Sequence, residues 1–222
     1  MPTSPVLRVF QSKEQTRAFY NKISGVYDFL SERSEAPMRR IGLDLLRPTA
    51  GETILEIGCG TGHCLVSIAE AVGPKGMALG LDLSDKMLEQ ARATLAKGGV
   101  RERAKLRRGD AVALPYADES IEGVFMSFTL ELFDTPEIGL VLRECRRVLR
   151  PNGRIVVVAM SKVGPDDPLL RFYEWTHKHF PKFVDCRPIY AGEALKKAGF
   201  VIKKSLIKRM WVPVEIVLAS KA

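Results

Sequence analysis

Short apolar runs alternate with amphipathic segments through the middle of the chain. Apolar runs of strand length occur at residues 53–57, 77–81, 104–108, 121–125 and 155–159. Apolar residues recur every three or four positions, as in helices, at 62–72, 85–97 and 135–149. Strands joined through helical crossovers form a parallel sheet with helices on both faces, so the pattern predicts an α/β doubly wound domain.

The ends of the chain depart from this alternation. Residues 11–46 have helical periodicity, so we expect residues 1–50 to form an N-terminal helical cover of a main domain at 51–222. A segment at about 164–188 is rich in proline and aromatic residues and predicts a helical insertion over the sheet's edge.

A helix at 191–198 and two final strands follow the insertion, at 200–207 and 214–219. The short connection between these strands implies antiparallel pairing. The expected sheet therefore has seven strands and is mostly parallel, with an antiparallel last strand.

Charge is unevenly distributed. The 222 residues include 34 Lys and Arg against 26 Asp and Glu, a net charge of +8. Residues 51–160 carry 14 basic and 15 acidic side chains, whereas residues 161–222 carry 12 and 6. The basic excess in the last third favours an anionic membrane surface or an anionic small substrate over nucleic acid, for which the chain has no recognisable module.

The four cysteines are scattered and form no C-x-x-C pair, so we expect reduced thiols and no metal site. The N-terminal residues lack the apolar run of a signal peptide, and no apolar stretch approaches the length of a membrane span. These features predict a cytoplasmic protein with at most a peripheral membrane contact. Monomer and homodimer both stay open.

A glycine-rich loop, LEIGCGTGH at 55–63, ends the first strand and opens a helix. Glycines there let the backbone turn tightly and let a ligand touch the main chain, although a tight strand–helix turn alone also explains them. Asp82 follows the second strand, where an acid accepts hydrogen bonds from ribose hydroxyls. Asp110 follows the third strand and could accept a hydrogen bond from an exocyclic amine. Three such groups at one end of a sheet predict a nucleotide-type site.

These segments resemble the class I S-adenosylmethionine-dependent methyltransferases over about residues 18–222. The matching pieces are LEIGCGTG at 55–62, GLDLSDKML at 80–88, GDAVALPYADESIEGVF at 109–125 and LRECRRVLRPNGRIVVVAM at 142–160. The sequence FYNKI at 19–23, with Tyr27 and Asp28, resembles the N-terminal helix of the ubiquinone and menaquinone biosynthesis C-methyltransferases. The chain departs from them at SFTLE, 127–131, where relatives often carry a His pair. The resemblance implies a Rossmann-like fold and S-adenosyl-L-methionine as cofactor, with S-adenosyl-L-homocysteine as product.

The resemblance also implies cofactor-binding residues. Those expected near the methionine portion are Glu56, Gly58, Gly60, Gly62, Ser127 and Phe128. Glu56 is expected to orient the cationic amino end. Those expected around the adenosine portion are Asp82 on the ribose, Leu83 and Met87 beside the adenine, and Asp110 with the Ala111 N–H on the adenine edge.

Four residues are candidates for catalysis, each with a structural alternative. His63 begins the helix after the glycine loop and could touch substrate, or could bond a loop carbonyl. His177 in the aromatic segment could act as a general base, or could be a solvated histidine. Tyr27 could close over the sulfonium together with Tyr20, or both could pack in the core. Glu131 could orient an acidic proton, or could simply begin a helix.

The aromatic segment suggests a site for an apolar acceptor. The expected substrate contacts are Tyr20, Tyr173, Trp175 and Trp211, although the last three could equally fill the insertion's own core. Lysine and arginine pairs at 196–197, 203–204 and 208–209 suggest attraction to anionic lipid head groups, or an ordinary solvated surface.

The favoured function is methyl transfer to a small, lipophilic acceptor such as a quinol or phenol ring carbon. N-methylation of a phospholipid or another small molecule is the alternative. A nucleic-acid methyltransferase is less favoured because residues 127–130 lack the motif of amino-directed base methylation. An NAD-dependent oxidoreductase is less favoured because the glycine spacing is G-x-G-x-G rather than G-x-G-x-x-G.

Overall fold

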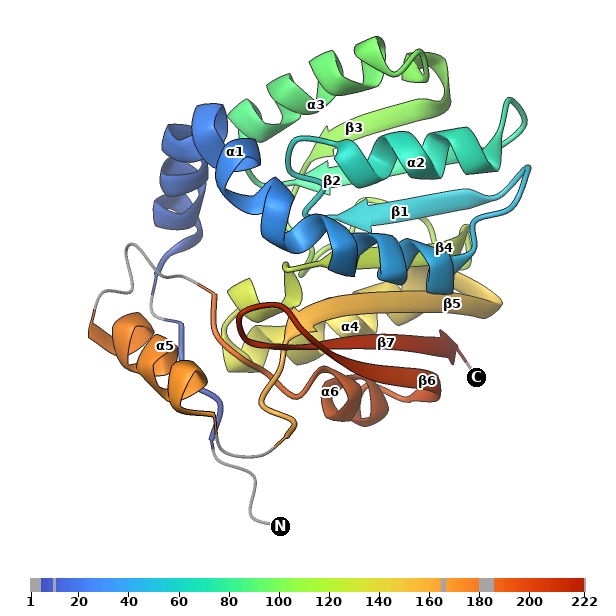
Figure 1. Cartoon of the computed structure of the whole chain (residues 1–222). Helices are drawn as coiled ribbons and strands as arrows, with labels where there is room; N and C mark the ends of the chain where they lie inside the picture. Colours follow the sequence, from blue (N-terminus) through green and yellow to red (C-terminus); the bar gives the residue numbers. More distant parts are fainter. Residues whose placement is uncertain (1–4, 10, 165–166, 180–185, 222) are drawn as a thin grey trace.

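A seven-stranded sheet forms the centre of the molecule, with strand order β3-β2-β1-β4-β5-β7-β6 (Figure 1). The computed structural model describes residues 5–9, 11–164, 167–179 and 186–221, and for residues 24–33 the backbone alone. The strands are β1 (Thr53–Ile57), β2 (Met77–Asp82), β3 (Ala104–Arg108), β4 (Ile121–Ser127), β5 (Leu149–Met160), β6 (Phe200–Arg209) and β7 (Pro213–Lys221). Strands β1 to β5 pair in parallel, and β7 pairs antiparallel with both β5 and β6. The predicted sheet, mostly parallel with an antiparallel last strand, is confirmed.

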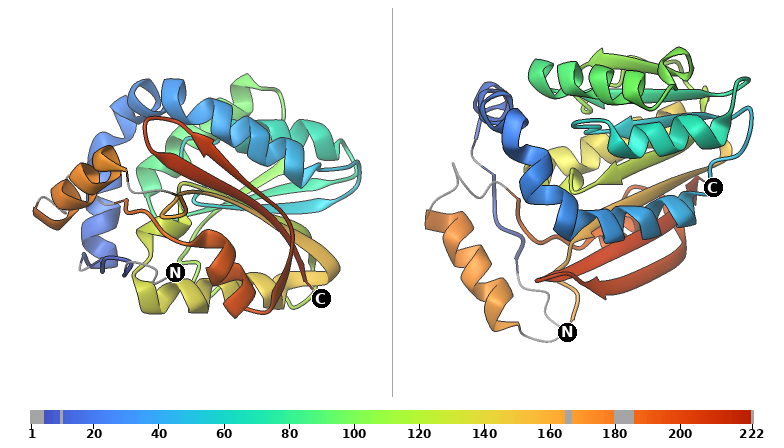
Figure 2. Two further views of the ribbon diagram at one scale, coloured as in Figure 1. Left: turned by 60° about the horizontal axis from the view of Figure 1, so that its bottom comes forward. Right: turned by 45° about the horizontal axis from the view of Figure 1, so that its top comes forward.

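Helices cover both faces of this sheet (Figure 2, left). They are α1 (Lys13–Leu46), α2 (His63–Val72), α3 (Asp85–Lys97), α4 (Thr135–Val148), α5 (Pro168–His179) and α6 (Ala191–Lys197), with short 3-10 turns η1 (Arg101–Arg103) and η2 (Leu130–Leu132). Helices α1, α2 and α3 pack on one face, and α4 and α6 pack on the other. Alternate residues of a strand enter different cores: Leu55 packs on the α4 side and Ile54 on the α2 side.

Helix α1 crosses from the carboxyl ends of the strands onto the α2 face (Figure 1). Its start is fixed by a capping box, in which Ser12 accepts from the Gln15 N–H and the Gln15 side chain accepts from the Ser12 N–H. Gly42 allows close packing on the sheet, because a Cβ there would lie 2.6 Å from Val158 Cγ2. The first half of α1 is thereby left over the carboxyl ends of the strands.

Two local details fix the elements around the sheet. Ser84 caps α3, because its hydroxyl accepts from the Met87 N–H at 3.1 Å. Strand β5 begins before the expected strand at 155–159 and includes residues 151–153. The pairing of β4 with β5 shifts register between Leu149 and Arg154, and Asn152 has φ +63°, so these turn-forming residues bulge out of a longer strand.

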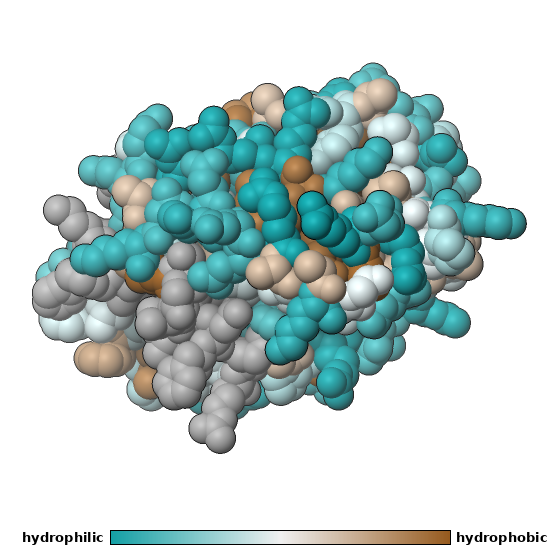
Figure 3. Space-filling view, turned by 90° about the horizontal axis from the view of Figure 1, so that it is seen from above, coloured by the Kyte–Doolittle hydropathy of each residue, from teal (hydrophilic) through white to brown (hydrophobic). Residues whose placement is uncertain are grey.

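Helix α5 lies within the predicted aromatic insertion, beyond the carboxyl ends of the strands and beside the tip of the β6–β7 hairpin (Figures 1 and 2). Residues 165–166 and 180–185 of that insertion lie outside the described residues. Over the part of the chain that is described, no helix combines the length and apolarity needed to cross a membrane. The face seen from above is mostly hydrophilic, with an apolar area at its centre (Figure 3).

Candidate functional site

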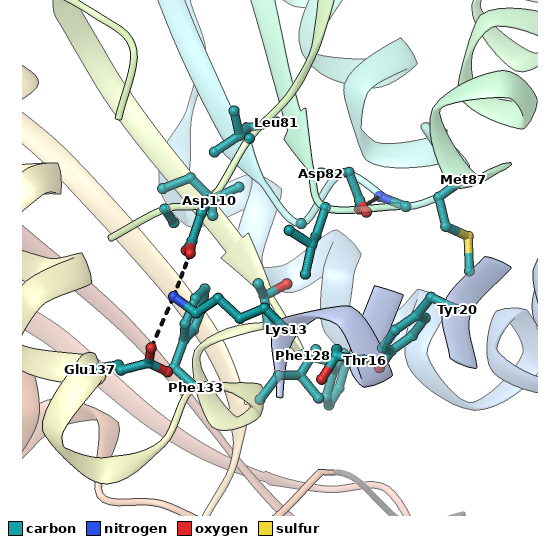
Figure 4. A pocket seen from close by; sticks show the side chains of 18 of the residues that line it. Lys13, Thr16, Tyr20, Leu81, Asp82, Met87, Asp110, Phe128, Phe133 and Glu137 are labelled. Atoms are coloured by element: carbon teal, nitrogen blue, oxygen red, sulfur yellow. Dashed lines mark hydrogen bonds and ion pairs between the residues drawn. The ribbon is translucent and has the colours of Figure 1, made fainter. Parts of the chain in front are cut away.

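A cleft opens at the carboxyl ends of the parallel strands, below the first turns of α1 (Figure 4). Its floor is formed by the loops that follow the strands, and the predicted residues that line it are Gly58, Gly60, Asp82, Leu83, Met87, Asp110, Ala111, Ser127 and Phe128. Its roof is formed by N-terminal residues, namely Val9, Gln11, Lys13, Thr16 and Tyr20. The side wall contains Leu132, Phe133, Asp134 and Glu137. The strand ends therefore converge as the sequence predicted.

The glycine loop is held against β2 by its backbone. Gly58 N–H donates to the Leu81 carbonyl at 2.8 Å, and Gly60 N–H donates to Asp82 Oδ2 at 2.8 Å. Gly58 has φ +68°, and a Cβ there would collide with the Thr129 side chain. Gly60 has φ +50°, and a Cβ there would meet nothing within 4 Å, so its backbone faces open space in the cleft. The loop therefore forms a cradle against which a ligand can lie on the main chain.

Gly62 has a different role from the one predicted. It caps α2 with φ +87°, and a Cβ there would lie 3.1 Å from the Ala91 backbone of α3. It does not line the cleft. This glycine allows α2 and α3 to pack closely.

Asp82 connects the first two strand ends. Its Oδ2 accepts from Gly60 N–H, and its Oδ1 accepts from Ser84 N–H at 2.8 Å. Burial raises the pKa of this carboxyl group, and the two backbone N–H donors oppose that rise. The carboxylate is thus held in place at the edge of the cleft, where ribose hydroxyls could donate to it.

Asp110 is paired with a roof residue that sequence reasoning missed. Lys13 Nζ contacts Asp110 Oδ2 and lies 2.9 Å from Glu137 Oε1, so it joins the loop after β3 to the first turn of α4 (Figure 4). Asp110 Oδ1 also accepts from Val112 N–H at 3.1 Å. The sequence marks the helix start at Ser12, but no local signal indicates that the next residue reaches a loop almost a hundred positions away.

Other contacts hold the roof to the side wall and to α3. Arg8 pairs with Asp134 at 2.6 Å, and this guanidinium holds the pKa of the carboxyl at about 2. Val9 N–H also donates to Asp134 at 3.0 Å. On the other side, the Ser84 hydroxyl donates to Asn21 Oδ1 at 2.7 Å. The roof is thus attached mainly through side chains.

Two buried oxygen atoms near the glycine loop have no partner in the described structure: Glu56 Oε2 and Ser127 Oγ. Glu56 is 3% exposed, and burial raises its pKa to about 8, against the opposing charge of Arg39. A buried polar group without a partner is costly. Ser127 lines the cleft, where a ligand could pair with its hydroxyl, whereas the predicted cofactor residue Glu56 does not line the cleft and lies buried behind it on β1.

The catalytic candidates are not brought together. His63 is exposed at the start of α2, and His177 is buried on the inner side of α5. Neither residue lines the cleft. Glu131 is fully buried and points away, with Oε1 accepting from Met160 N–H at 3.0 Å. Burial raises its pKa to about 8. The Tyr27 side chain lies outside the described residues, whereas Tyr20 lines the cleft.

The predicted acceptor contacts Tyr173, Trp175 and Trp211 also lie away from the cleft. Tyr173 packs edge-on against Trp211, with ring centroids 5.1 Å apart. Trp175 is 50% exposed and stacks on Phe172, which is 60% exposed. None of the three predicted residues lines the cleft, and Tyr173 is partly buried and packs against the core. Helix α5 turns Phe172 and Trp175 outward, an orientation that periodicity does not reveal.

The chain is similar in sequence to known methyltransferases. Residues 54–153 match a family model described as a methyltransferase domain. The chain is 30% identical over 217 residues to a demethylmenaquinone methyltransferase of Lactococcus lactis, covering 86% of this chain and 83% of that protein. It is 35% identical over 140 residues to a demethylmenaquinone methyltransferase of Lactobacillus johnsonii, covering 63% of this chain but only 56% of that protein.

The fold is also shared with solved structures. The [4+2]-cyclase SpnF superimposes with a TM-score of 0.77 at 17% identity, covering 98% of this chain and 99% of that one. Since that protein is named as a cyclase, the shared architecture shows the fold alone. The relatives at 30% identity and above are the evidence that bears on activity.

Proposed function

Because the chain belongs to the S-adenosylmethionine-dependent methyltransferases, in the family that includes the demethylmenaquinone methyltransferases, we propose that it methylates a ring carbon of a lipophilic quinol. The observation that carries this proposal is the similarity to a demethylmenaquinone methyltransferase over 86% of the chain. The relatives' names support this acceptor type, and the proposal requires that the cleft accommodate it.

The cleft residues fit the cofactor. Glu56 and Ser127 offer buried oxygen atoms without partners, which would suit the ammonium and carboxylate end of the methionine portion. Gly60 leaves open space along the backbone, and Asp82 would hold the ribose hydroxyls. Leu83 and Met87 line the wall where adenine would lie, with Asp110 and Ala111 at its edge.

The acceptor would occupy the space beneath the roof. Figure 4 shows Tyr20 and Thr16 of α1 on the roof side of the cleft, near Phe128 at the end of β4. Val9 adds an apolar side chain from the N-terminal segment. These residues would exclude water and hold a flat ring in line with the methyl group. The rings of Tyr20 and Phe128 would also favour a cationic centre nearby.

Methyl transfer from this cofactor requires the protein mainly to align the acceptor with the methyl group. The cofactor supplies a methyl group on a positively charged sulfur, which is already an activated electrophile. In the proposed reaction, the acceptor's ring carbon would form a bond to that methyl carbon as the carbon–sulfur bond breaks, and the sulfur would keep the electron pair. The ring carbon would then give up its proton to solvent, which restores the aromatic ring. All three histidines of the chain are described, and none lines the cleft. The acceptor's own ionised hydroxyl would supply the electron density.

Methyl-labelled S-adenosylmethionine tests the proposal with reduced demethylmenaquinone and phosphatidylethanolamine as competing acceptors. We expect label on the quinol ring carbon, identified by mass spectrometry of the extracted lipid, and loss of that label in Asp82→Ala. Label on the phospholipid amine, on a quinol oxygen or only on water-soluble compounds would overturn the proposed acceptor. Asp85→Ala, one turn further along and exposed, is the matched control and should retain activity.

A further inference from the structure

Helix α5 carries apolar side chains on both its inner and its outer side. On the inner side, Leu170 and Tyr173 are partly buried and pack against the core, and His177 is 3% exposed. On the outer side, Phe172 is 60% exposed and Trp175 is 50% exposed. A surface helix ordinarily buries its apolar residues, so the outer pair points to an apolar partner outside the chain.

The helix is firmly held in this orientation. Arg209 pairs with Asp167 at 2.8 Å at its N-terminal end, and Lys162 pairs with Glu174 at 2.5 Å in its middle. The edge-to-face contact of Tyr173 with Trp211 joins it to the β6–β7 hairpin. The outward aromatic side is therefore fixed by contacts on the inner side.

Exposed apolar residues concentrate at this place. Eight large apolar side chains are exposed among the described residues, and five of them lie on α5, just before it or at the adjoining hairpin tip. We call four of these the aromatic patch: Leu169, Phe172, Trp175 and Trp211. The remaining exposed apolar side chains, Leu140, Val201 and Ile207, lie on other elements.

Exposed positive charge surrounds the patch. Arg171 and Lys178 lie on the exposed side of α5, and Lys208 lies on the adjoining hairpin. The acids of this region, Asp167 and Glu174, are turned towards Arg209 and Lys162 and so add little negative field outward. Tryptophan, phenylalanine and leucine bordered by lysine and arginine are the composition of helices that lie in the interface of an anionic bilayer.

The patch is linked to the roof of the cleft through the N-terminal segment. Helix α5 lies beyond the carboxyl ends of the strands (Figure 2), which is also the end at which the cleft opens. Lys162, which anchors α5 through Glu174, also donates to the Pro5 carbonyl at 3.0 Å, and Val9 of that same N-terminal segment lines the cleft. A surface that covered the aromatic patch would therefore lie next to the N-terminal segment that roofs the cleft.

We propose that the aromatic patch docks this protein on an anionic lipid bilayer, with Phe172, Trp175 and Trp211 entering the interface. The inference goes beyond the proposed function, since it concerns where the protein works and holds for any lipid-borne acceptor. Docking would bring the cleft to the bilayer surface, so that an acceptor need not cross water. The contact is peripheral, because the apolar residues form one side of a single short helix and one hairpin tip.

Vesicle flotation tests the proposal, using phosphatidylcholine vesicles with and without phosphatidylglycerol. The full chain should bind the anionic vesicles and bind the neutral ones more weakly. The double variant Phe172→Ser/Trp175→Ser should lose at least about tenfold in binding. Lys178→Glu/Lys208→Glu should lose binding by about fivefold per charge, in a salt-dependent way. The chain's two tryptophans are both in the patch, so their fluorescence should shift to shorter wavelength on binding.

The matched control is Leu140→Ser/Val201→Ser, which removes two exposed apolar side chains elsewhere (41% and 44% exposed) and should leave vesicle binding unchanged. Absence of binding to anionic vesicles, or equal loss in the control, would overturn the proposal. Light scattering that shows a dimer, and its dissociation in Phe172→Ser/Trp175→Ser, would also overturn the proposal. The patch of one copy would then be covered by the patch of another. Binding is measured without methyl transfer, so a wrong acceptor leaves this result intact.

Discussion

The loop after β1 and the segment before α1 face each other across the cleft, yet they are held in different ways. Gly58 and Gly60 are fixed by backbone N–H groups that donate to Leu81 and Asp82 inside the domain. Opposite them, Arg8 and Lys13 reach partly exposed carboxylates through long side chains. Buried backbone contacts keep a binding cradle in one shape, whereas exposed ion pairs are weak and can open. The floor is therefore preorganised, and the roof is the part that can move to admit ligands.

The largest effect is expected on the floor, at Gly58. Gly58→Ala forces a side chain into a left-handed conformation and against Thr129, so the free energy of unfolding should fall by about 2–4 kcal/mol. Chemical denaturation measures this. Gly51→Ala is the matched control, because Gly51 has φ +88° but no neighbour within 4 Å, and strain alone should cost about 1 kcal/mol. Equal losses in the two variants would show that Thr129 does not restrict this position.

The second-largest effect is expected at Asp82, on the affinity for ligand. Asp82→Ala removes the acceptor of Gly60 N–H and Ser84 N–H together with the proposed ribose contact. S-adenosylhomocysteine should then bind about 10-fold to 100-fold more weakly by calorimetry. Asp85→Ala removes an exposed carboxylate three residues away and should change the affinity little. If both variants bind like the unaltered protein, Asp82 does not contact the ligand.

Glu56 should make ligand binding depend on pH. Its pKa is about 8 in the free protein, so it is largely protonated at neutral pH, and a bound ammonium group favours the charged form. Affinity for S-adenosylhomocysteine should rise with pH up to about 8, with a slope approaching tenfold per unit. Glu56→Gln should flatten that profile. The same raised pKa makes Glu56 lower the folding stability as pH rises from about 5 to 8, because the folded state must then ionise a buried acid.

The smallest effect on stability is expected in the roof. Lys13→Gln removes two partly exposed ion pairs, so the free energy of unfolding should change by less than about 1 kcal/mol. The roof should nevertheless open more readily, so S-adenosylhomocysteine should dissociate faster in stopped-flow measurements. Lys22→Gln, an exposed change further along α1, is the control. Unchanged dissociation in Lys13→Gln would mean that the roof does not restrict release.

The strand-end residues of the cleft could be predicted because their signals are local. A glycine loop, Asp82 and Asp110 each follow an apolar run, and parallel strands bring such positions to one end of the sheet. His63 and Glu131 were predicted by the same proximity along the chain, but a helix start can face solvent and a short turn can point inward. The number of residues between a side chain and a motif does not determine the direction in which that side chain points.

The sequence by itself determined the alternation of strands and helices, the chemistry at the strand ends and the place of the basic excess. These depend on periodicity and short-range spacing, which folding preserves. Only the tertiary structure decided that Lys13 meets Asp110, that Gly62 serves helix packing, and that α5 presents Trp175 outward. These features depend on contacts between residues that are far apart in the chain. They also depend on which side of a helix makes the stronger contacts with the rest of the molecule.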